Sequence, residues 1–222
     1  MERLETVLYR ARNLDVAELG EAVQAIGFEC TRCGACCSRS GNEAHVATVF
    51  PREIREIRAE TGRAFREVAR PIPFGLEGDS GETFEWALQT DDCGDCTFHE
   101  TDNPSGSRCG IYSSRPLICR TYPFDVDLGF GGDRLEAVAE RSGDLIAYEC
   151  QGLGEPIGRE RARSLAETVR ERAIRDIEEA IAVRDQYEPV SGDHDIVVHD
   201  SEGAKKPDGT PIHGRGPSSN KD

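Results

Sequence analysis

The chain has 222 residues, of which 37% are hydrophobic and 31% are charged, and its formal net charge at pH 7 is −15. This length and composition are typical of one globular domain with a modest core, and the acidic excess argues against nucleic acid or an anionic membrane as a partner. Lysine occurs only at positions 205, 206 and 221. Acidic excess with scarce lysine predicts either a halophilic protein, whose carboxylates keep the surface hydrated in high salt, or a GC-rich genome.

The N-terminal sequence gives the expected compartment. Residues 1–5 carry acids and lack the apolar segment of a signal peptide, and no run of 18 apolar residues occurs along the chain. We therefore expect a cytoplasmic protein. In the cytoplasm, clustered cysteines bind metal or react more often than they form disulfides.

Residues 2–27 have helical periodicity, with apolar residues from Leu4 to Ile26 on one stripe. Asn13 and Asp15 are capping residue types, which is compatible with two helices and a bend, and Gly27 ends the segment. Residues 30–37 follow as turns. Residues 45–50 resemble a strand, and Pro51 begins a helix to about residue 59 that ends before Gly62.

A short helical turn is expected at 63–69, and residues 83–89 alternate, which predicts a half-buried strand with Phe84, Trp86 and Leu88 on one face. An extended segment at 109–112 precedes a helical turn near Pro116. Residues 124–128 and 135–140 flank a glycine-rich turn at 129–132, which predicts a hairpin. Residues 157–187 form a long amphipathic helix.

The composition changes after residue 190 to Gly, Pro, Ser and Asp, which predicts a disordered acidic, Gly-Pro-rich tail over 191–222 behind a domain spanning 1–190. The expected fold class is α+β. In this fold a small, irregular, mostly antiparallel β region carries the cysteines, and helices flank it at the N- and C-terminal ends.

Nine cysteines carry the chemistry, and four of them fall within the eight residues 30–37. They are Cys30, Cys33, Cys36, Cys37, Cys93, Cys96, Cys109, Cys119 and Cys150. The first three have the spacing of cysteines that bind three corners of an iron–sulfur cluster, with a fourth ligand from elsewhere in the chain. Pairs two residues apart, such as Cys93 and Cys96, also form half of a tetrahedral zinc site. Two four-cysteine sites would use eight sulfurs, and the adjacent Cys36 and Cys37 could serve separate centres or bridge two metals.

Other interpretations of these residues remain open at this point. Packing alone does not require such a density of thiols, whereas a redox switch or disulfide would use them. His45 and His99 are more typical of ordinary strand-edge histidines than of ligands. Five arginines near the cysteines either offset thiolate charge or simply lie on the surface: Arg32, Arg39, Arg108, Arg115 and Arg120.

Three motifs together resemble one known family. Residues 30–37 read CTRCGACC, residues 109–124 read CGIYSSRPLICRTYPF after a CTF at 96–98, and residues 150–154 read CQGLG. Over residues 28–154 the chain resembles the CxxCxxCC (YkgJ-like) cysteine-cluster family of zinc- or iron-chelating domains. The resemblance implies a metal-binding domain whose ligands are every cysteine except Cys93. Cys93 is an addition to the family pattern, and His99 replaces an apolar residue; either could extend the site.

The function expected from the residues and the resemblance is that of a cysteine-cluster metal-binding protein. An iron–sulfur cluster would suit electron transfer or redox sensing with a protein or redox partner, whereas Zn²⁺ in a closed all-cysteine site would be structural. One alternative is a protein lysine N-methylase-like enzyme, because relatives resembling flagellin lysine N-methylase carry this cluster within a larger protein, although this chain is short and shows no glycine-rich loop for S-adenosylmethionine. The other is a metal storage or delivery protein that uses spare sulfurs as exchangeable ligands.

Overall fold

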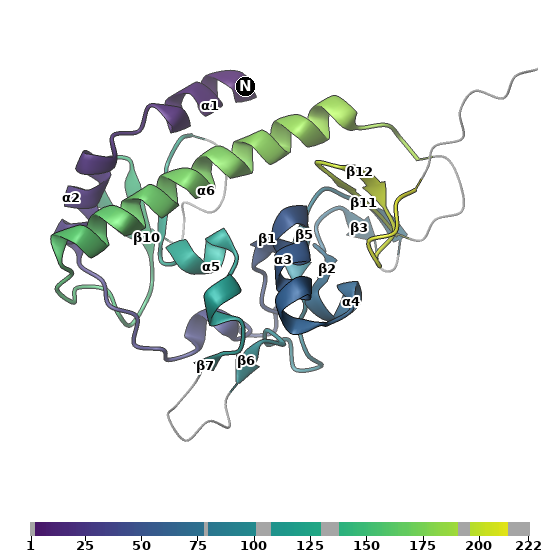
Figure 1. Ribbon diagram of the computed structural model, residues 1–222, viewed down its shortest axis with the longest axis horizontal. Coiled ribbons are helices and arrows are strands. Elements are labelled where there is room, and N and C mark those ends of the chain that lie inside the picture. The colour runs from purple at the N-terminus through teal and green to yellow at the C-terminus, as the bar shows by residue number, and fades with distance from the viewer. Residues whose placement is uncertain (1–2, 78–79, 101–107, 130–137, 191–195, 213–222) are drawn as a thin grey trace, which may run out of the picture.

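The computed structural model describes residues 3–77, 80–100, 108–129, 138–190 and 196–212. Over these residues the chain has the expected α+β fold, with helices toward both ends and small sheets between them (Figure 1). The helices are α1 (Leu4–Arg12), α2 (Val16–Ile26), α3 (Pro51–Thr61), α4 (Phe65–Val68), α5 (Leu117–Thr121) and α6 (Arg159–Gln186), with 3-10 turns η1 (Ala35–Cys37) and η2 (Tyr112–Ser114). None of these helices combines the length and the hydropathy that a bilayer crossing needs.

Four small sheets account for the strands. The first has the order β1-β5-β2, from β1 (Thr48–Val49), β5 (Trp86–Leu88) and β2 (Ala69–Pro71). The second has the order β8-β10-β9, from β8 (Phe124–Val126), β10 (Leu145–Tyr148) and β9 (Val138–Ser142). The third has the order β12-β11-β4-β3, from β12 (Gly203–Lys205), β11 (Ile196–Asp200), β4 (Ser80–Thr83) and β3 (Leu76–Glu77), and the fourth pairs β6 (His99–Glu100) with β7 (Arg108–Cys109).

The first hydrophobic core lies where α2 and α1 pack along α6, and it also includes side chains of β8 and β10 (Figure 1). Asp15 caps α2 by accepting the backbone N–H of Ala17 at 2.7 Å, and Gly27 ends this helix. The predicted split of residues 2–27 into two helices is therefore confirmed, with Asp15 as the cap. Val23 and Val169 are fully buried between α2 and α6.

A second core lies under α3 and α4, against the sheet of β1 and β5. Ile54 and Ile57 face into it with no exposed surface, and Gly62 ends α3 in the left-handed conformation, as the sequence predicts. The predicted strand at 83–89 is wrong in one respect. The chain leaves one sheet after Thr83 and enters another at Trp86, so Phe84 is 48% exposed and Ala87 is buried.

Arg172 fixes α6 to the elements below it. Its side chain is buried and donates to Thr121 Oγ1 of α5 at 3.1 Å and to Asp125 Oδ2 of β8 at 3.1 Å. Asp176, one turn along α6, lies 3.5 Å from the same guanidinium. Since a buried cation is tolerated only when it is paired, this contact specifies how α6 sits on α5 and β8.

The predicted hairpin around residues 129–132 is wrong in its pairing. β8 pairs with β10 rather than with β9, and β9 and β10 form the hairpin instead, around Gly143. Gly143 has a positive φ of 61°, which a tight turn between strands requires. Residues 130–137 themselves lie outside the described residues.

The prediction of a disordered tail over 191–222 is wrong for residues 196–212. Strand β11 pairs in parallel with β4, and β12 pairs antiparallel with β11. Val197 and Val198 are buried, and Asp200 accepts the indole N–H of Trp86 at 2.7 Å. Residues 191–195 and 213–222 lie outside the described residues. Residues 196–212 therefore belong to the folded domain, which does not end at residue 190.

Candidate metal centre

The loop that carries the first four cysteines is shaped by two residues in the left-handed region. Arg32 has φ 55° and Gly34 has φ 78°, and Gly34 then accepts the backbone N–H of Cys37 at 2.8 Å to close η1. The turn leaves Cys30, Cys33 and Cys36 exposed, while Cys37 points toward the second core. The loop therefore presents thiols on both sides of the backbone.

Backbone pairing brings two further cysteines to this loop. The backbone N–H of Cys96 donates to the carbonyl of Cys37 at 2.8 Å, and the Cys96 side chain is buried. Cys109 stands opposite His99 in the pairing of β6 with β7. Cys96 and Cys109 thus lie at one side of the loop, although they follow Cys37 by 59 and 72 positions in the chain.

Cys119 is positioned by α5, whose first turn is capped from another helix. The Glu53 carboxylate accepts the backbone N–H of Leu117 at 2.7 Å and that of Phe50 at 3.0 Å, so that one side chain caps both α5 and α3. Burial raises the pKa of Glu53, although both amide hydrogen bonds oppose this shift. Glu53 therefore orients the helix that holds Cys119.

Cys150 is brought to the loop by a short pairing between the two ends of the motif region. Phe28 forms a bridge with Leu153, and the backbone N–H of Glu29 donates to the carbonyl of Gly152 at 2.9 Å. A Cβ at Gly152 would lie 2.0 Å from the Glu29 carbonyl oxygen. Gly152 therefore allows the close approach that sets Cys150 beside Cys30.

We expect Gly152→Ala to lower the melting temperature by about 2–12 °C, since overpacking costs roughly 1–3 kcal/mol and each kcal/mol corresponds to about 2–4 °C in a protein of this size. Metal content should fall with it, because Cys150 loses its position. Gly158→Ala is the matched control, since a Cβ there meets nothing within 4 Å. Equal melting temperatures and metal contents for the two variants would contradict this role of Gly152.

A cavity of about 650 Å³ opens between these segments, and six cysteines line it. They are Cys30, Cys36, Cys37, Cys96, Cys109 and Cys119. His45 and His99 also line the cavity, as do Arg32, Arg108 and Arg115. The sequence did not favour the two histidines as ligands. The feature that could have indicated His99 is its position three residues after Cys96. Arg39 and Arg120 are exposed and do not line the cavity.

The thiols are close enough to influence one another's ionisation. Burial raises the pKa of Cys119, and the thiols of Cys96, Cys36 and Cys109 raise it further. Burial also raises the pKa of Cys96 to about 11, with Cys109 and Cys36 as the next contributors among the thiols.

A second group surrounds Cys150. Burial raises the pKa of Cys150, and Cys33, Cys36 and Cys30 add to the shift. Cys36 thus contributes to both groups. Its own pKa is lowered to about 7, first by a hydrogen bond from the Cys37 thiol and further by the positive charge of Arg115.

The donor set fits a thiophilic metal. The Sγ atoms of Cys36 and Cys37 lie 3.9 Å apart, close to the edge of a tetrahedron of sulfurs around one ion, which is about 3.8 Å for a metal–sulfur bond of about 2.3 Å. Among the described residues, no three His, Cys, Asp or Glu side chains are already arranged to hold an ion. The thiols would therefore have to turn inward on binding, which is the coupling of metal binding to folding that cysteine sites show.

Cys93 stands apart from the other eight cysteines. It is exposed and does not line the cavity. Its backbone N–H donates to Asp91 Oδ1 at 2.9 Å in the turn before Cys96. The structure thus gathers the eight cysteines that the family resemblance implies, in two overlapping groups, and leaves the ninth on the turn outside.

Comparison with known families identifies the family of this chain. A family model named CxxCxxCC, with the description "Putative zinc- or iron-chelating domain", matches residues 29–151, which is more than half of the chain. The chain belongs to the CxxCxxCC family. The match begins one residue before Cys30 and ends one residue after Cys150, so all nine cysteines lie inside it.

A curated relative of this CxxCxxCC protein is the uncharacterized protein MJ0661 of Methanocaldococcus jannaschii, which is 28% identical over 109 residues. The alignment covers 49% of this chain and 51% of the relative, so the two proteins match over about half of each. No solved structure matches the chain significantly. Family membership thus supports a zinc- or iron-binding domain without naming the metal.

Proposed function

We propose that this protein carries a two-centre metal–thiolate site, with iron–sulfur chemistry and a redox or electron-transfer role. One centre would use Cys37, Cys96, Cys109 and Cys119, and the other Cys30, Cys33, Cys36 and Cys150. The observation that carries the proposal is where the thiols lie relative to the two hydrophobic cores, with Cys36 close to thiols of both groups.

The two hydrophobic cores support the same division. Cys96 is buried in the second core, and Cys37, Cys109 and Cys119 pack against it, whereas Cys150 packs against the first core. The two groups of thiols therefore lie on different parts of the fold and meet at the loop 30–37. Each group has four sulfurs, which is the ligand number of an iron–sulfur cluster and of a structural zinc site.

Two features favour iron–sulfur chemistry. The cavity volume of about 650 Å³ far exceeds the space of one ion, given that a water molecule occupies about 30 Å³. Arg32 and Arg115 lie at the cavity with their guanidinium carbons 5.4 and 3.9 Å from the Tyr112 ring centroid. Cations beside thiolates offset their charge and tune a reduction potential. The exposure of Cys30, Cys33 and Cys36 would let a redox partner approach one centre.

Zinc is the second candidate, and the 3.9 Å separation of Cys36 and Cys37 favours it, because a single tetrahedral ion would hold both sulfurs at that distance. In that case one ion would take ligands from both groups and the site would be structural.

Purification without oxygen, followed by assays of Fe, Zn and acid-labile sulfide and by a visible spectrum, distinguishes the two candidates. We expect brown protein that contains iron and sulfide in an amount that requires two centres per chain. Colourless protein with stoichiometric zinc would replace the iron–sulfur proposal by the zinc one. Metal-free protein with oxidised thiols would rule out both.

A further inference from the structure

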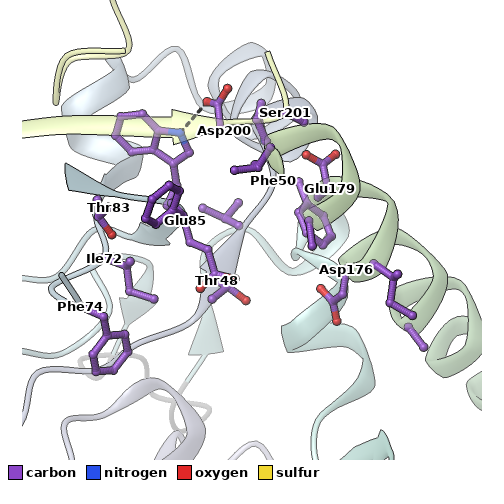
Figure 2. A pocket seen from close by; sticks show the side chains of 18 of the residues that line it. Thr48, Phe50, Ile72, Phe74, Thr83, Glu85, Asp176, Glu179, Asp200 and Ser201 are labelled. Atoms are coloured by element: carbon purple, nitrogen blue, oxygen red, sulfur yellow. Dashed lines mark hydrogen bonds between the residues drawn. The ribbon is translucent and has the colours of Figure 1, made fainter. Parts of the chain in front are cut away.

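A second and larger cavity, of about 730 Å³, lies between α6 and the strands β1, β5, β8 and β10, and β11 contributes to one end (Figure 2). No cysteine is among the residues that line it. Its volume is in the range of small-molecule sites, about 300–1,000 Å³. It is therefore a candidate ligand site of its own, separate from the cysteine cavity.

Much of the lining is aromatic. Six aromatic side chains contribute to it: Phe50, Phe74, Phe84, Trp86, Tyr148 and Tyr187. Phe74 is 69% exposed and Phe84 is 48% exposed, which is high for phenylalanine and leaves part of each ring available to a ligand, although Phe84 also stacks on His199 with ring centroids 5.6 Å apart. Phe84 and Tyr187 are in contact, with ring centroids 5.7 Å apart. Aromatic faces attract both hydrocarbon and organic cations.

The charged part of the lining is almost entirely acidic. Six carboxylates contribute to it: Glu85, Asp125, Asp127, Asp176, Glu179 and Asp200. Among the described lining residues, Arg184 is the one lysine or arginine, and it is already bound to Glu5 and Asp185 at 2.8 Å. The cavity therefore has a negative potential, and an anionic ligand would be repelled.

Four of the carboxylates already have cationic partners in the surrounding structure. These pairs are Asp125 and Asp176 with Arg172, Asp127 with Arg141, and Asp200 with Lys205. Glu85 and Glu179 form no ion pair within 4 Å in the part of the chain that the structure describes. Figure 2 shows Glu179 on α6 across the cavity from Glu85 on the strand side. Glu179 is half-buried beside Ser201, and burial raises its pKa.

We propose that this cavity binds a small organic cation, a primary amine on a compact hydrocarbon body. The ammonium group would pair with Glu179 and Glu85, and the hydrocarbon would pack on the aromatic lining. A neutral ligand of the same shape would desolvate these carboxylates without compensating them, which costs free energy. A cation also favours the ionised form of Glu179 and so opposes the effect of burial on its pKa.

Calorimetric titration of the full chain with three ligands that share one ring tests this proposal: cyclohexylmethylamine, cyclohexylmethanol and cyclohexanecarboxylate. We expect the amine to bind at least about tenfold more tightly than the alcohol, and the carboxylate not to bind. Equal affinity for amine and alcohol would overturn the proposal, and so would an amine that gives no binding heat up to about 10 mM.

Two variants locate the site. Glu179→Gln and Glu85→Gln should each weaken amine binding by about tenfold, because each removes one charge-assisted hydrogen bond, and binding of the alcohol should not change. Glu171→Gln is the matched control, since Glu171 is an exposed residue of the same helix that does not line the cavity. Amine affinity that is unchanged in both cavity variants would overturn the proposal. Metal content, measured in parallel, should be the same in all three variants and reports separately on the cysteine site.

Discussion

Cys119→Ser and Cys150→Ser are each expected to retain about half of the metal of the wild-type protein, whereas Cys36→Ser should lose more than either. The reason is the division of the thiols, in which Cys119 and Cys150 belong to different groups and Cys36 adjoins both. Metal analysis of anaerobically purified variants measures this directly. Loss of a ligand is also loss of folding free energy, so the melting temperature should fall by roughly 10 °C, given about 2–4 °C per kcal/mol.

Cys93→Ser is the matched control, because Cys93 is an exposed cysteine outside the cavity. It should keep the metal content and the melting temperature of the wild type. Complete loss of metal in both Cys119→Ser and Cys150→Ser, with the helical circular dichroism retained, would indicate one shared centre. Full metal content in Cys119→Ser would remove that residue from the ligands, and metal loss in Cys93→Ser would add the ninth cysteine to them.

The helices could be predicted from the sequence because their signals are local. Asp15, Gly27, Pro51 and Gly62 each mark a helix boundary by their own conformational or capping preference. The failure at 83–89 has a physical cause. Alternation assumes that one face of one strand meets solvent, whereas this segment changes sheet, and β5 is buried on both faces.

The candidate ligands could also be predicted, because the motif spacings name the cysteines one by one. Their grouping could not. Cys150 reaches Cys30 through the backbone pairing of residues 27–29 with residues 152–154, and Cys109 reaches the site through a sheet of two strands with two residues each. Such pairings depend on contacts between distant segments, for which a single sequence carries no local signal. The cavity that we propose to bind an amine was even less predictable from the sequence, since its lining comes from strands and a helix spread over most of the chain.

A chain that ends after Val190 is expected to be unfolded or to melt far below the wild type. It would lose β11 and β12, which carry the buried side chains of Val197 and Val198, and it would lose the parallel partner of β4. Burying one such side chain contributes roughly 1.5–3 kcal/mol, so the two valines and the strand pairing together contribute about 5 kcal/mol or more. The total stability of a domain is only about 5–15 kcal/mol.

The indole of Trp86 provides a direct measurement, since it is the single tryptophan of the chain and its N–H donates to Asp200 at 2.7 Å. Its fluorescence should shift to the red in the truncated protein as the ring becomes hydrated. A chain that ends after Ile212 keeps β11 and β12 and is the matched control. Val198→Ala is a milder variant that should still fold, and we expect it to cost about 2 kcal/mol. If residues after 190 were a disordered tail, both truncated proteins and the valine variant would have the melting temperature of the wild type. A melting temperature that falls only when β11 is removed or weakened would establish this strand as part of the fold.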